Sequence, residues 1–175
     1  MVVTSPPTSS NTSLGGGPNG SVPAPTALRV GDGDEISRLV FTQLIAPGVD
    51  KFVLQPLFEF PTAGGRIESV IWRNVVPADP DVHEMGCAKE TNDRAKGKRR
   101  EYRGFRTATA GDVRSRKTRN GHGFLVYHSP QEGPAHVHVK VELAADASYG
   151  KNDRQDVRAL IEQAFLSFSP HSCAA

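Results

Sequence analysis

The chain is poor in cysteine and has no long apolar run. Its 175 residues contain two cysteines, Cys87 and Cys173, too few for a disulfide framework or, by themselves, a zinc site. We therefore expect a reducing compartment, with one bridge between subunits as the open alternative. No apolar run approaches the roughly 18 residues of a membrane span. The first residues also lack the basic and apolar segments of a secretory signal.

Common enzyme motifs are missing too. There is no Gly-x-Ser-x-Gly nucleophile motif, and the glycine run at 15–17 lacks the Lys-Ser/Thr of a phosphate-binding loop. His83 precedes Cys87 by four residues, but catalytic partners are usually brought together by the fold and not by short spacing. We therefore expect no catalytic residue, no metal and no cofactor.

Residues 1–27 consist mostly of Ser, Thr, Pro, Gly and Asn, and nothing in them can bury an apolar face. This composition predicts an extended, flexible arm without a fold of its own. Such an arm becomes ordered when neighbouring molecules hold it, so we expect it to lie on adjacent subunits. The remaining residues, 28–175, have the length of a single domain.

The first half of that domain is β-rich. Residues 34–46 fit a helical stripe as well as a strand, and both alternatives stay open. The segments 51–60 and 66–76 predict a hairpin within a sheet. Two prolines in 76–86 predict a loop there.

The second half predicts two strands and a helix. Residues 121–128 and 135–143 have strand patterns, separated by a turn. An amphipathic helix over 153–168 is indicated by apolar residues at helical spacing, namely Val157, Leu160, Ile161, Ala164, Phe165 and Phe168. We predict an α+β fold, an antiparallel sheet with this C-terminal helix packed on one face.

Residues 94–119 form a basic segment that carries 11 of the 21 Lys and Arg residues. Tyr102 and Phe105 lie among them, and Glu101 and Asp112 are the acidic residues. Because the planar arginine fork suits phosphate, the segment predicts a nucleic-acid contact. A solvated loop, an acidic protein partner or a membrane surface are the alternatives. The predicted phosphate contacts are Arg99, Arg100, Arg103, Arg106, Arg114, Arg116, Lys117 and Arg119.

The strand at 135–143 alternates strictly, with His136, His138 and Lys140 on one side and valines on the other. A half-buried strand explains this pattern, and a metal site or an acid/base pair is the alternative. With Glu142, the string HVHVKVE resembles the first motif of cupins, His-x-His-x-x-x-Glu, although no second motif follows. It also resembles the alternating motif of histidine-triad nucleotide hydrolases, with Lys140 in place of the third histidine.

The order of elements resembles that of the coat proteins of small single-stranded RNA phages. The basic β region and the strand–turn–helix succession at 135–168 carry this resemblance. It implies a sheet whose open face contacts the genome. We therefore expect a bacteriophage capsid protein that assembles in the host cytoplasm from many copies into a virion. Single-stranded RNA or another nucleic acid would contact the basic segment together with His136, His138 and Lys140.

Two other functions stay open. One is a small His-dependent or metal-dependent enzyme, or a secreted bacterial effector, that uses His136 and His138. The other is a monomeric RNA-binding module.

Overall fold

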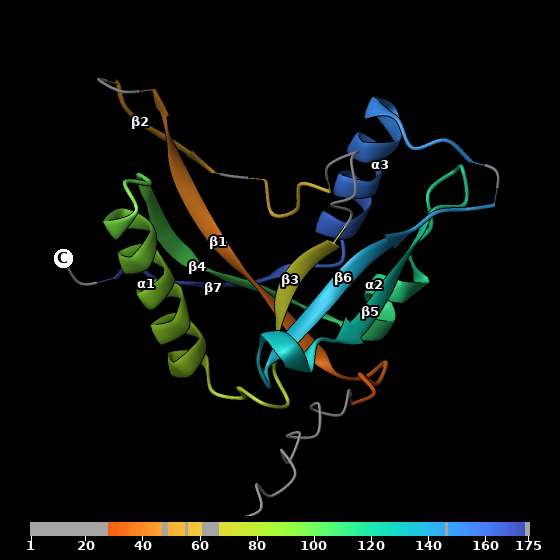
Figure 1. Ribbon diagram of the computed structural model, residues 1–175, viewed down its shortest axis with the longest axis horizontal. Helices are drawn as coiled ribbons and strands as arrows, with labels where there is room; N and C mark the ends of the chain where they lie inside the picture. Colours follow the sequence, from red (N-terminus) through yellow and green to blue (C-terminus); the bar gives the residue numbers. More distant parts are fainter. Residues whose placement is uncertain (1–27, 47–48, 55, 61–66, 146, 174–175) are drawn as a thin grey trace, which may run out of the picture.

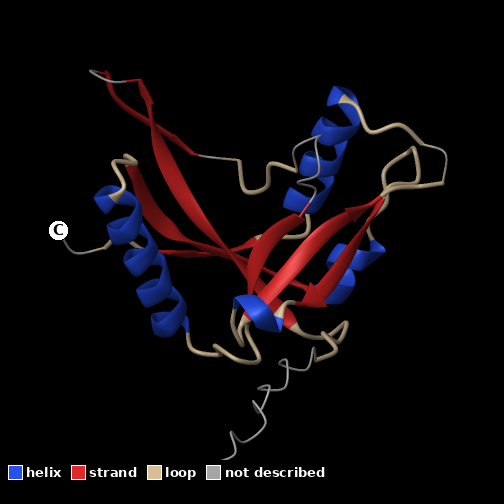
Figure 2. Cartoon of the chain, viewed as in Figure 1, coloured by secondary structure: helices blue, strands red, loops and turns tan. Residues whose placement is uncertain are grey.

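The computed structural model describes residues 28–46, 49–54, 56–60, 67–145 and 147–173, and the predicted arm at 1–27 lies outside these ranges. Figures 1 and 2 show the arrangement of the helices and strands. In chain order they are β1 (Glu35–Ala46), β2 (Val49–Leu54), β3 (Ile67–Trp72), α1 (Asp79–Ala95), β4 (Arg100–Thr109), α2 (Ala110–Ser115), β5 (Gly123–His128), the 3-10 turn η1 (Pro130–Glu132), β6 (His136–Glu142), α3 (Lys151–Glu162) and β7 (Ser167–Pro170).

The described strands form one seven-stranded antiparallel sheet, which makes the fold α+β as predicted. Its strand order is β5-β6-β3-β1-β4-β7, and β2 pairs with β1 beside this path. The central strand β1 pairs with β4 along one edge, from Glu35 opposite Thr109 to Gln43 opposite Arg100. The first described strand of the chain is therefore the middle of the sheet.

The other edge of β1 is shared by two strands and has a gap between them. β3 pairs with β1 only at Ile36 and Ser37, and β2 pairs with it from Thr42 onward. Within the described ranges, residues 38–41 thus have no partner strand on this edge. Figure 1 shows β1 and β3 diverging from the end where they pair.

Alternate residues of the strands pack on opposite faces of the sheet, as their period of two requires. Helix α3 covers one face, and the residues of β6 and α3 in this main core are Val137, Val139, Val141, Val157 and Ile161. Helix α1 covers part of the opposite face, where Val82 packs with Ile71 and Phe105. Each fully buried apolar side chain contributes roughly 1.5–3 kcal/mol relative to exposure.

The loop predicted at 76–86 is wrong, because α1 begins at Asp79. Pro80 lies in the first turn, where a missing N–H costs nothing. The buried side of this helix is largely polar or small, with Gly86, Glu90 and Asp93 among its buried residues, so no apolar stripe marks it in the sequence. Gly86 is needed there because a Cβ would overlap the Tyr102 ring.

The ambiguity at 34–46 is resolved as a strand, β1. The predicted hairpin of 51–60 with 66–76 is wrong, since β2 pairs with β1 whereas β3 pairs with β1 and β6. β2 thus pairs with the strand just before it, whereas both partners of β3 are more distant in the chain. The strands predicted at 121–128 and 135–143 correspond to β5 and β6, which pair with each other.

The C-terminal helix is shorter than the predicted 153–168. α3 ends at Glu162, and the chain continues into β7, which pairs with the outer edge of β4. Phe168 therefore lies on an edge strand and is 45% exposed, whereas Phe165 is fully buried in the main core.

Cys87 of α1 and Cys173 form a disulfide within one chain, with Cα atoms 5.5 Å apart. This differs from the expectation of reduced cysteines and from the alternative of a bridge between subunits. Neither cysteine is a free thiol, so Cys87 is not a nucleophile beside His83. None of the helices in the described ranges combines the length and apolar character needed to cross a bilayer.

Candidate functional site

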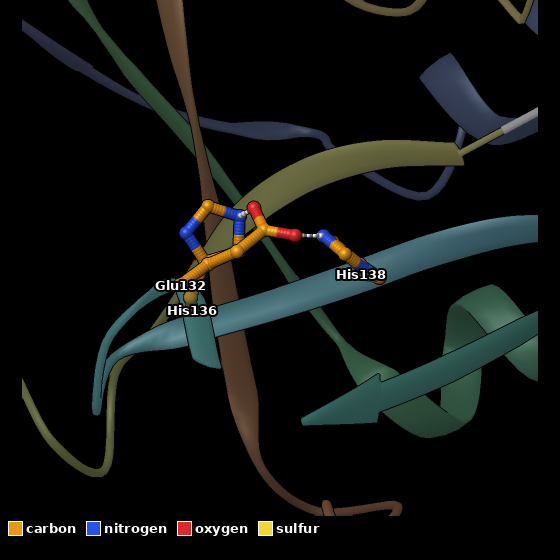
Figure 3. A group of neighbouring side chains, drawn as sticks. All are labelled: Glu132, His136 and His138. Carbon is orange, nitrogen blue, oxygen red and sulfur yellow. Dashed lines mark ion pairs between the residues drawn. The ribbon is translucent and has the colours of Figure 1, made fainter. Parts of the chain in front are cut away.

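Glu132, His136 and His138 converge at one end of β6. The two Nε2 atoms lie 2.9 Å (His136) and 3.0 Å (His138) from different oxygens of the Glu132 carboxylate. Figure 3 shows the carboxylate between the two rings, with one oxygen directed at each. All three side chains offer a ligand atom, and these atoms lie within 4.8 Å of one another.

Local structure explains this convergence. Residues two apart on a strand share a face, so β6 presents both imidazoles on the side away from its buried valines. Glu132 ends η1, and the chain turns back toward β6 at Gly133, whose φ of 135° is a conformation that favours glycine. The N–H of His136 donates to the carbonyl oxygen of Gly133 at 3.1 Å and closes this turn.

Burial lowers the pKa of His136, and His138 lowers it further, against the opposite effect of the Glu132 carboxylate. The Nε2 atom of His136 is buried and has no hydrogen bond among the described residues. The nearest Glu132 oxygen is close enough, but the angle is unsuitable for a hydrogen bond. The site therefore contains a buried imidazole nitrogen that is close to a carboxylate but has no hydrogen bond to it.

A pocket of about 660 Å³ adjoins this site, and Glu132 and His136 form part of its wall. It lies at the gap in the sheet, because Arg38, Leu39, Val40 and Phe41, the β1 residues without a partner strand there, also line it. Other lining residues come from β3, α1 and the segment before β6. The pocket is a consequence of the strand pairing.

The eight predicted phosphate contacts of the basic segment are spread over several elements, and four of them form ion pairs. Arg100 pairs with Asp93, Arg103 with Glu101, Arg114 with Asp32, and Arg116 with Asp112. Arg106 donates to the carbonyl oxygen of Phe165. Among the described residues, ion pairs are absent for the exposed side chains of Arg99, Lys117 and Arg119. These three lie in two different loops, after α1 and after α2.

His138 and Lys140 lie on the sheet face opposite the main core, where both are partly exposed. Tyr127 is opposite His138 on β5, with the two rings edge to face at 5.4 Å between centroids. Leu125 is opposite Lys140 on β5 and Ile67 is opposite it on β3. Both of these apolar side chains are exposed, so the face is mixed in character and is not purely cationic.

A second histidine cluster lies under α1. His83 Nδ1 is 3.0 Å from the Tyr102 hydroxyl, and Ser169 Oγ is 3.2 Å from His83 Nε2. The ring of His171 stacks on that of His83 at 4.3 Å. This cluster links α1 to β4 and to the C-terminal segment.

Sequence reasoning selected His136 and His138 but missed Glu132. The cupin-like reading pointed instead to Glu142, which shares their strand but is exposed and outside the cluster. Glu132 precedes His136 by four residues in a turn that contains Gly133, and this spacing was the available signal. Comparisons with protein-family models, curated proteins and solved structures gave no match.

Proposed function

We propose that the protein binds a divalent transition-metal ion through Glu132, His136 and His138, and that it acts as a small metal-dependent enzyme. The observation that carries this proposal is the convergence of the three ligand atoms within 4.8 Å. Two imidazoles and one carboxylate are a ligand set that catalytic zinc sites use, with water in a further position. The same set also serves Fe(II) in sites with open positions.

The spacing supports a metal ion. Ligand atoms held at 2.0–2.1 Å from a tetrahedral zinc ion are about 3.3 Å apart. The observed separations of 2.9 and 3.0 Å involve the two different oxygens of Glu132. For an ion bound by both oxygens, they reach this value with shifts of a few tenths of an ångström. The unsatisfied Nε2 of His136 supports the same conclusion, because a metal ligand must offer a free nitrogen lone pair. A bound ion would supply Lewis-acid chemistry to a molecule in the adjoining pocket.

Zinc titration of the chelator-treated full-length chain tests the proposal. We expect about one ion per chain, and an affinity loss of tenfold or more in His136→Ala, His138→Ala and Glu132→Gln, since each removes one of few ligands. Glu142→Gln and His171→Ala are matched controls, because both residues are exposed and lie outside the cluster. Failure of the wild-type chain to bind Zn²⁺, Fe²⁺ or Mn²⁺ would refute the proposal, as would binding that survives loss of all three ligands.

A coat protein that contacts nucleic acid is the second candidate. It is favoured by the sheet face that carries His138 and Lys140, which lies opposite α3. The exposed cations Arg99, Lys117 and Arg119 would add contacts to phosphate. Size-exclusion chromatography with absorbance at 260 and 280 nm tests this candidate. A large particle that contains nucleic acid supports it, and a nucleic-acid-free monomer refutes it. A monomer that binds RNA with a steep salt dependence would instead indicate the RNA-binding module.

A further inference from the structure

The pocket beside the proposed metal site has a mixed wall, with apolar side chains interspersed with charged and polar ones. Apolar side chains reach it from β1, β3 and α1, and they include Leu39, Val40, Phe41, Val70, Ile71 and Met85. Its volume of about 660 Å³ lies within the range of small-molecule sites, roughly 300–1,000 Å³. The apolar part of this wall suits the body of a small organic molecule.

The two arginines that line this pocket, Arg38 and Arg100, already have acidic partners. Arg38 pairs with Glu68 at 2.7 Å, and its Nε also donates to the carbonyl oxygen of Leu57 at 2.9 Å. Arg100 pairs with Asp93 and lies over the ring of Phe41 at 4.5 Å. Both arginines are held by the protein itself, so neither offers an unpaired charge to a ligand.

Lys89 differs from these arginines. It lies on α1 as an exposed residue at the pocket wall, and it has no ion pair among the described residues. Partial burial lowers the pKa of its ammonium group, and neighbouring cations lower the pKa further, although Asp93 opposes them. The cations are Arg38, Lys98 and Arg100. An anionic group beside Lys89 would relieve this repulsion and complete the charge pairing.

We infer that the pocket binds a small organic carboxylate with an apolar body, its carboxylate on Lys89 and its body in the gap between β1 and β3. One part of such a ligand lies next to Glu132 and His136, which share the pocket wall. That the carboxylate is the substrate of the metal site rests on the proposed function. Its binding to the pocket does not.

Calorimetry tests this inference with two probes added to the full-length chain. The probes are 4-phenylbutyrate and the matched neutral alcohol, 4-phenylbutanol. We expect the acid to bind about tenfold more tightly, as for one charge-assisted contact. Lys89→Met should remove this preference and leave the alcohol unchanged. Lys117→Met is the matched control, because Lys117 is exposed like Lys89 but lies outside the pocket. Met85→Trp should weaken both ligands by filling the pocket.

The outcomes separate this inference from the metal proposal. Acid binding that persists after chelator treatment, and in a His136→Ala/His138→Ala variant, supports the pocket whether or not zinc binds. Three results would overturn the inference: equal affinity for acid and alcohol, no effect of Lys89→Met, or no binding of either probe. Zinc binding by the wild-type chain together with any of these three would leave the metal proposal standing.

Discussion

Arg38 and Glu68 form an ion pair inside the gap between β1 and β3, with 2.7 Å between Nη2 and Oε2. The guanidinium also donates to the carbonyl oxygens of Leu57 and Ser69. The second oxygen of Glu68 accepts a hydrogen bond from the N–H of Glu59 at 3.1 Å. These two side chains therefore join β1, β3 and the segment at 56–60 where no strand pairing does so.

Arg38→Met should destabilise the protein by about 3 kcal/mol, because it leaves the largely buried Glu68 carboxylate without its partner. Urea unfolding measures this change. Arg103→Met is the matched control, since Arg103 pairs with Glu101 at the surface, with side-chain exposures of 42% and 40%, and should cost less than about 1 kcal/mol. Equal losses in both variants would show that Arg38 is not a structural bridge.

Phe165→Ala should cost about 3–5 kcal/mol, because Phe165 is fully buried and packs on Phe58. Phe168→Ala should cost less than about 1 kcal/mol, since its ring is half exposed and its described ring contact is with the Arg106 guanidinium. Urea unfolding of both variants makes the comparison. Similar costs would mean that the helix continues through Phe168, contrary to the structure.

Reduction of the disulfide between Cys87 and Cys173 should lower stability by about 2–4 kcal/mol, because the bridge closes a long loop, with a sequence separation of 86. The measurement is the urea midpoint with and without dithiothreitol. The Cys87→Ala/Cys173→Ala variant should be less stable than wild type and should not respond to the reductant. A wild-type midpoint that is unchanged by reduction contradicts the prediction.

His83 should titrate below its ordinary pKa of 6.5, because burial lowers this pKa, as do the nearby charges of His171 and Arg73, against the opposite effect of Asp79. An unfolded imidazole binds a proton more readily than this folded one. The stability that His83 contributes is therefore fully present above pH 6.5 and decreases as pH falls toward the folded pKa. The hydroxyls of Tyr102 and Ser169 also face this ring.

Histidine NMR titration of the full chain measures the pKa of His83 directly. His171→Asn should raise the pKa toward 6.5, and Asp79→Asn should lower it. Glu142→Gln, on a distant strand, should leave it unchanged. A midpoint at or above 6.5 in the wild-type protein would contradict the prediction.

The parts of the fold that were predictable have regular apolar patterns. The alternation in β6 and the stripe in α3 each place buried residues at a fixed period, and the structure buries Val137, Val139, Val157 and Ile161. The sequence pattern did not predict α1, because the buried face of this helix carries polar side chains that are held by hydrogen bonds and ion pairs. Glu90, for example, accepts a hydrogen bond from the N–H of Tyr102 at 2.7 Å.

The site was predictable only in part, for a related reason. A strand pattern places His136 and His138 on one face, but Glu132 joins them through a turn whose direction depends on the backbone at Gly133. The pocket depends on where β3 leaves β1 and where β2 begins, which is a matter of long-range register. The ion pairing of the basic segment likewise depends on residues far along the chain, such as Asp32, which pairs with Arg114.

The central place of β1 has a consequence for folding. This strand precedes all the other described strands in the chain, yet its longest pairing is with β4, which starts more than fifty residues after β1 ends. During synthesis β1 emerges with both edges unpaired, and such non-local pairing is slow. A nascent chain would have to keep this β-rich segment from self-association until β4 leaves the ribosome.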